Sequence, residues 1–250
     1  GVHQDERRHF LRIQVLREVT TAANQQVGLE PWGRLRASYC GLEAGARFTQ
    51  EWCRKLGLPP EDLKGGVETL LDQLRRRMLL HDAQRGIFTR WWNEGDREIQ
   101  RGYMPILPGP QGMKLRIDPG DNKRYVRPWL TERSTLVRQI ALKWGVPQDD
   151  IPAFLEALWD YLRSDTVMLL VPVTLKSGKD KALANCSGVY QIDSGKLLLS
   201  ENHGHYRCKR CRRKVSRRTP NNKCMAWQCD GELEFIAEDT DNYDLQLLDQ

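Results

Sequence analysis

The chain has 250 residues with a net charge of +6, and 40% of its residues are hydrophobic. This content, together with eight tryptophans, is typical of a folded protein and argues against an intrinsically disordered chain. No apolar stretch approaches the roughly 20 residues that a membrane-spanning helix requires, so we expect no membrane partner. The length allows two or three domains. Because the chain begins with Gly-Val-His instead of methionine, we expect it to be a fragment of a longer protein.

The first 46 residues are expected to form a linker or packing segment that contains one helix and one strand. Between residues 5 and about 23, four arginines lie opposite a row of apolar residues, the arrangement of an amphipathic helix with a solvated face. Residues 35–42 are expected to form the strand.

The middle of the chain contains an internal repeat, whose offset of 88 positions is the separation of Gly57 from Gly145. At this offset residues 57–63 align with residues 145–151. Other aligned pairs are Lys55 with Lys143, Glu68 with Glu156, Leu70 with Leu158, Asp72 with Asp160, Leu74 with Leu162, and Arg75 with Arg163. Because the shared pattern extends beyond the turn without a gap, it predicts a structural duplication.

Each copy is expected to form a short helix, a longer helix and then strands. The short helices are predicted at residues 48–56 and 134–144, where glycine and proline follow. Apolar residues at helical spacing predict the longer helices that come next. In the second copy, residues 188–192 and 196–199 are expected to pair as a hairpin.

This order of elements is the plan of a winged helix. The predicted fold class is therefore α+β, with a first winged-helix-like domain at 47–128 and a second winged-helix domain at 129–200. The two long helices are poor candidates for reading DNA bases, because acidic residues dominate them. The second carries Asp149, Asp150, Glu156, Asp160 and Asp165 against Arg163, which would repel phosphates and favours contact with a protein. In the first, Arg75, Arg76 and Arg77 could contact the nucleic-acid backbone or simply complement the helix dipole.

Four cysteines near the C-terminus form the most specific motif of the chain. Cys208 and Cys211 form one close pair, and Cys224 and Cys229 form another. Two such pairs separated by one loop suit tetrahedral coordination of zinc, and we predict a zinc ribbon at 201–237 with these four ligands. The alternatives are two disulfides or four unrelated thiols. An acidic tail follows at 238–250.

The remaining cysteines bear on the cellular compartment. Cys40, Cys53 and Cys186 are scattered singly, which gives an odd total of seven and no disulfide framework. We therefore expect a reducing, cytoplasmic location.

Basic residues surround the cysteine motif. They could hold nucleic-acid phosphates, or they could pair with the acidic tail or with an acidic partner surface. The residues predicted to contact nucleic acid here are Lys209, Arg210, Arg212, Arg213, Lys214, Arg217 and Arg218, in addition to Arg75, Arg76 and Arg77.

The sequence contains no motif that predicts catalysis. A phosphate-binding GxxxxGK[ST] loop, HExxH and GxSxG are all missing. No cysteine and histidine lie in a recognisable catalytic motif, so we expect this chain to catalyse nothing by itself.

The order of these parts resembles the accessory region of very large bacterial superfamily-2 helicases, the Lhr-like and DEAD/DEAH-type proteins of DNA repair and phage-defence systems. The tetracysteine module is the specific part of this resemblance. The matching pieces are residues 6–12, 35–42, 70–80, 188–192 and 206–233, with 241–243 similar to the lead into a next domain. The resemblance implies a parent protein that hydrolyses ATP to move along or remodel DNA. The ATPase motifs of the family have no matching positions here, so no catalytic residue is carried over.

Three functional hypotheses follow. The first is a non-catalytic DNA-binding and docking region of an ATP-dependent helicase or translocase, which grips the DNA backbone for motor domains outside this chain. The second is a scaffold that docks a partner subunit through acidic surfaces. The third is a winged-helix transcription regulator, which would require a reading helix that neither long helix resembles.

Overall fold

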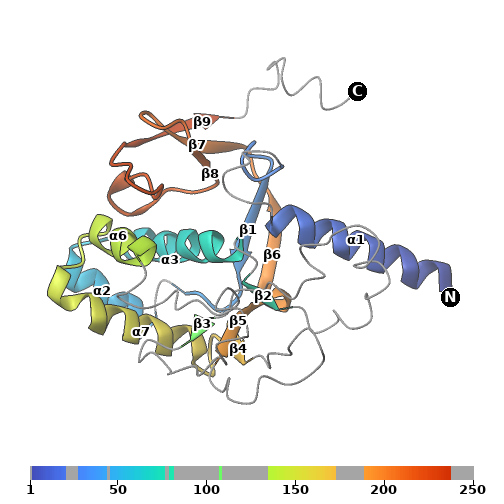
Figure 1. Cartoon of the computed structure of the whole chain (residues 1–250), viewed down its shortest axis with the longest axis horizontal. Coiled ribbons are helices and arrows are strands. Elements are labelled where there is room, and N and C mark those ends of the chain that lie inside the picture. Colours follow the sequence, from blue (N-terminus) through green and yellow to red (C-terminus); the bar gives the residue numbers. More distant parts are fainter. Residues whose placement is uncertain are drawn as a thin grey trace, which may run out of the picture.

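Helices and three small sheets make up the computed structural model, which describes residues 2–20, 28–43, 46–76, 79–81, 107–108, 135–172 and 189–237 (Figure 1). The predicted α+β class is confirmed. The helices are α1 (Val2–Thr20), α2 (Arg47–Leu56), α3 (Pro60–Arg75), α6 (Thr135–Lys143) and α7 (Ile151–Arg163). The strands are β1 (Leu35–Tyr39), β2 (Leu80–His81), β3 (Leu107–Pro108), β4 (Leu170–Pro172), β5 (Val189–Asp193), β6 (Leu197–Glu201), β7 (Gly204–Cys208), β8 (Lys214–Val215) and β9 (Leu233–Ala237).

The helix boundaries follow the repeat that the sequence predicts. Helices α2 and α6 begin at equivalent positions of the two copies, and α3 and α7 end at equivalent positions. Gly57 and Gly145 end the short helices with φ values of 64° and 90°, a left-handed conformation that glycine adopts without strain. The duplication of the helix pair is thus present in the structure.

The two copies share one hydrophobic core. Phe154 of α7 lies with its ring centroid 5.8 Å from that of Phe48 and 4.9 Å from that of Trp52, both on α2. Trp144, which follows α6, packs edge-on against the same Phe154 ring at 6.0 Å. All four residues belong to one buried cluster that also includes residues of α1, α3 and β5. The helix pairs therefore stabilise each other, and they lie together on one side of the molecule (Figure 1).

Strand β5 lies at the centre of one sheet. It pairs with β2 in parallel and with β3 and β4 in antiparallel orientation. Ile192 of β5 is opposite Leu80 of β2 and also opposite Leu170 of β4, so these two strands occupy opposite edges of β5. One strand from each copy of the repeat is thus joined through the same central strand.

The predicted hairpin between residues 188–192 and 196–199 is wrong. Both edges of β5 are already occupied, so β6 cannot pair with it. Instead a short 3-10 turn, in which Gly195 N–H donates to the Asp193 carboxylate at 2.9 Å, leads into β6, and β6 pairs with β1. The winged-helix arrangement accordingly stays a prediction.

The third sheet, in the order β8-β7-β9, carries the cysteine motif. The β1–β6 ribbon leads toward it (Figure 1), and the close approach of Gly33 and Gly204 joins the two parts. Arg77, Cys186, the acidic tail and most of the residues between β2 and α6 lie outside the described residues. Within the described part of the chain, no helix combines the length and apolar character that crossing a bilayer requires.

Candidate metal centre and basic surface

The structure brings the four predicted cysteines together. Their Sγ atoms all lie within 4.8 Å of one another, with 3.6 Å between Cys208 and Cys229 and 3.6 Å between Cys211 and Cys224. Four thiolates around zinc at about 2.3 Å would lie about 3.8 Å apart, close to this arrangement. A disulfide requires sulfurs at about 2.05 Å, so the pairs are not disulfide-bonded. This cluster could therefore hold a metal ion such as zinc.

Backbone donors favour thiolates at this site. Cys211 N–H donates to the Cys208 sulfur, and Ala226 N–H donates to the Cys224 sulfur, each at 3.4 Å. Burial raises the pKa of the Cys208 thiol, but hydrogen bonds from the backbone of Cys211 and Arg210 and from the Cys211 and Cys229 side chains together lower that pKa to about 7. Burial raises the pKa of Cys224, so its thiolate needs a cation beside it, which a bound metal supplies.

Gly231 is required by the geometry of the cluster. A Cβ atom at this position would lie 2.5 Å from the Cys208 sulfur. Any side chain here would displace a ligand, so the glycine lets the chain pass the metal centre closely.

The sheet that carries the cysteine cluster is docked onto the helical core. Met225, between the second pair of ligands, is buried in the main hydrophobic cluster and accepts a hydrogen bond from the Trp144 indole at 3.3 Å. Pro220 packs so closely on α3 that a Cβ atom on Gly66 would lie 2.6 Å from its ring. The predicted zinc ribbon is therefore a fixed part of the fold.

A buried ionic network joins this sheet to α3. Arg217 reaches from the ribbon to the carboxylates of Glu68 and Asp72, the latter at 3.2 Å. Arg75 of α3 contacts Glu30 at 2.9 Å and Asp72 at 2.9 Å, and its Nε donates to the Tyr39 hydroxyl at 3.2 Å. Burial alone would raise the pKa of Asp72, but the two guanidinium groups hold it below its usual value.

The network corrects the expected role of three arginines. The side chains of Arg75 and Arg217 are 0% and 3% exposed, so neither can reach a phosphate from this position. Arg76, at 9% exposure, is held by Glu30 at 3.0 Å. These residues are structural because each guanidinium group is engaged with buried acceptors inside the protein. Sequence alone could not show this, since Glu30 is 45 positions from Arg75 and Glu68 is 149 positions from Arg217.

The other predicted basic residues lie at or near the surface. Arg210 pairs with Asp230, and Arg212 lies 3.8 Å from Glu234. Lys214 lies over the Trp32 ring with its ammonium nitrogen 3.9 Å from the ring centroid. The rest are exposed and form no ion pair with any described residue: Lys209, Arg213 and Arg218. The exposed residues Lys209, Arg210, Arg212, Arg213 and Arg218 are hereafter called the basic surface.

The structure identifies one exposed aromatic residue that the sequence analysis did not predict as part of the site. Trp227, between Cys224 and Cys229, is 45% exposed. Met225 in the same loop is buried, so the loop alone does not determine which of its side chains face solvent, and no signal in the sequence identified Trp227.

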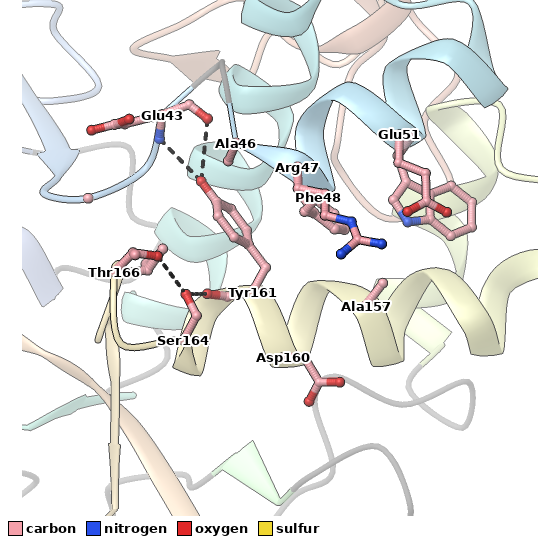
Figure 2. A pocket seen from close by; sticks show the side chains of 13 residues that line it. Glu43, Ala46, Arg47, Phe48, Glu51, Ala157, Asp160, Tyr161, Ser164 and Thr166 are labelled. Carbon is pink, nitrogen blue, oxygen red and sulfur yellow. Dashed lines mark hydrogen bonds between the residues drawn. The ribbon is translucent and has the colours of Figure 1, made fainter.

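A separate hollow of about 790 Å³ lies between α2 and α7 (Figure 2). The rings of Phe48 and Tyr161 stack there at 5.0 Å, and the Tyr161 hydroxyl accepts a hydrogen bond from Glu43 N–H at 3.1 Å. Figure 2 shows the guanidinium group of Arg47 between the two helices. Charges of both signs line this hollow, and their arrangement indicates no particular reaction.

No protein-family model, curated protein or solved structure matches the chain. Inference about its function therefore rests on the metal centre and on the surfaces around it.

Proposed function

We propose that this chain is the non-catalytic, zinc-containing nucleic-acid-binding and docking region of an ATP-dependent DNA helicase or translocase. The observation that carries the proposal is the set of five exposed basic residues that form the basic surface, in a segment whose cysteine cluster is fixed to the helical core. The proposal that the parent protein has motor domains rests on the resemblance of the sequence to superfamily-2 helicases.

The proposed mechanism is electrostatic. Guanidinium and ammonium groups bind phosphate oxygens without reading sequence, and binding releases counterions from the nucleic acid. Arg210 and Arg212 could exchange their carboxylate partners for phosphates at small cost, because exposed ion pairs contribute about 0–1 kcal/mol. The docked core would transmit force from the motor domains to the bound strand.

Trp227 would add a stacking contact near this surface. A base stacked on an aromatic side chain contributes about 1–3 kcal/mol and does so for any sequence. Asp230, which pairs with Arg210, comes three residues after Trp227 in the chain.

The first prediction concerns salt-dependent binding to fluorescent DNA. Changing Lys209, Arg213 and Arg218 to glutamine should lower affinity at low salt about tenfold or more. It should also reduce the slope of log affinity against log salt by about 2–3, because each lost phosphate contact removes about 0.7–0.9 from that slope. Fluorescence anisotropy on single- and double-stranded DNA measures both quantities.

A matched control variant removes the same number of positive charges from helix α2. Arg47, Arg54 and Lys55 on α2 are equally exposed, and changing them to glutamine should leave the slope near that of the wild type. Equal losses in the two triple variants would show that net charge alone attracts DNA and would contradict a defined basic surface.

The second candidate, a scaffold for a partner subunit, is favoured by one comparison within the repeat. In the first copy Glu68 and Asp72 dock the arginine of another segment, Arg217. At the position of α7 equivalent to Asp72, Asp160 is exposed to solvent. This carboxylate could receive an arginine from a partner protein.

Charge reversal tests this candidate. Changing Asp149, Asp150 and Asp160 to lysine should release a bound partner subunit from the full assembly after nuclease treatment, as measured by co-purification. These side chains are exposed, so the variant should stay folded, with a loss of about 1 kcal/mol for each lysine placed at the N-terminal end of α7. An assembly that stays intact in this variant would rule out the scaffold surface on α7.

A further inference from the structure

Lys143, the last residue of α6, reaches from the helical core into the metal module. Its ammonium group donates hydrogen bonds to the backbone carbonyls of Cys224 at 2.7 Å, Ala226 at 2.8 Å and Cys229 at 2.6 Å. Two of these carbonyls belong to predicted metal ligands, and the third lies between them. All three donors of the ammonium group are therefore used on one loop.

The equivalent lysine of the first repeat has no such role. Lys55 is 46% exposed, pairs with Glu51 one turn earlier at 2.9 Å, and lies over the Trp52 ring at 4.4 Å. Both lysines occupy the last turn of a short helix, where a positive charge complements the helix dipole in either copy. The contact with three carbonyls is thus specific to the second copy and is not explained by the repeat itself.

The loop between Cys224 and Cys229 has a particular need for this contact. It contains four residues between its ligands, against two between Cys208 and Cys211, and it passes through a left-handed conformation at Gln228 with φ of 55°. Three carbonyl oxygens that converge on one point repel each other unless a cation lies between them. A site in which four thiolates hold a dication would also carry a net negative charge. The Lys143 ammonium group would partly offset that charge.

Neighbouring contacts hold the same loop against the end of α6. Asn221 donates from Nδ2 to the carbonyl of Lys143 at 3.2 Å, and Gln228 N–H donates to the Gln139 side chain at 3.5 Å. With the Trp144–Met225 contact, these bonds join residues 221–229 to residues 139–144.

We propose that Lys143 is a positioning residue of the metal centre, and that metal occupancy and the docking of residues 221–229 on α6 are one coupled event. Metal binding shapes the loop so that its carbonyls converge, and Lys143 binds only that shape. By linkage, Lys143 strengthens metal binding, and the bound metal in turn stabilises the docked C-terminal end of α6. This inference concerns the stability of the metal site and does not depend on nucleic-acid binding.

The test compares Lys143→Met with Lys55→Met in the zinc-loaded chain. We expect zinc transfer to a chromogenic chelator to be about tenfold or more faster for Lys143→Met, as is typical when a group that supports metal ligands is removed. Lys55→Met should release zinc within about twofold of the wild-type rate. Equal release rates for the two variants would overturn the proposal.

A second measurement uses the wild-type chain and so does not depend on the folding of a variant. Hydrogen exchange is followed at residues 141–146 and at the equivalent residues 53–58, before and after zinc is removed. Coupling predicts faster exchange at 141–146 after removal, with little change at 53–58. The same change in both segments, or no change in either, would overturn the proposal.

Discussion

Replacing Arg75 with methionine is expected to lower the free energy of unfolding by about 3–5 kcal/mol, because removing one partner leaves buried carboxylates without compensation. Arg75 is fully buried and contacts Glu30, Asp72 and Tyr39, and it also donates to the Val19 carbonyl. Methionine fills similar space but supplies none of these donors. In this variant Glu30 would still be paired with Arg76, and Asp72 would still be paired with Arg217. The variant should therefore lose about 3–5 kcal/mol of stability without unfolding completely.

Urea denaturation measures this loss, and the repeat supplies the control. Arg163 occupies the equivalent position of α7, where it is exposed and lies over the rings of Trp159 and Tyr190 at 5.5 and 4.8 Å. Arg163→Met should therefore lower stability by about 1 kcal/mol, the contribution of exposed cation–π contacts. Similar losses for the two variants would mean that the buried network contributes little.

The repeat shows which structural features could be predicted from the sequence. Helix positions depend on local signals, such as the left-handed glycines and the apolar spacing, and these are present in both copies. The environments of Lys55 and Lys143, or of Asp72 and Asp160, differ although the residues align. Burial of the first-copy charges depends on segments far along the chain, since Glu30 lies 45 positions from Arg75 and Arg217 lies 149 positions from Glu68. No local pattern carries that information.

Strand pairing likewise could not be predicted from local sequence patterns. The turn at residues 193–195 is present, but a turn signal does not state which edges of a strand are free. Ile192 is fully buried between Leu80 and Leu170, so β5 is committed to strands from both copies and β6 must pair elsewhere. The cysteine cluster, in contrast, was predictable with all four cysteines, because two short spacings bring two thiols together whatever the rest of the fold does.

The metal site also predicts the largest effect on the chain. Cys208→Ser should abolish stoichiometric zinc binding, since Cys208 is fully buried in the cluster and its sulfur lies 3.6 Å from that of Cys229. Structural zinc contributes on the order of 10 kcal/mol to small zinc-dependent folds. The cluster of Cys208, Cys224, Cys229 and Leu233 is the small core of the β8-β7-β9 sheet, so the interior of this sheet has few apolar contacts of its own to replace the metal.

Metal content by atomic emission and hydrogen exchange at β7 and β9 measure the outcome. We expect zinc to fall from one equivalent to none, and amide protection in both strands to be lost. Cys40→Ser is the control, because Cys40 is partly exposed and lies outside the cluster, and it should keep one equivalent of zinc. Because Arg217 and Met225 join the sheet to the helices, loss of the metal should also reduce protection in α3 and at the end of α6. Unchanged protection in both helices, with zinc absent, would mean that the docked module holds its shape without metal.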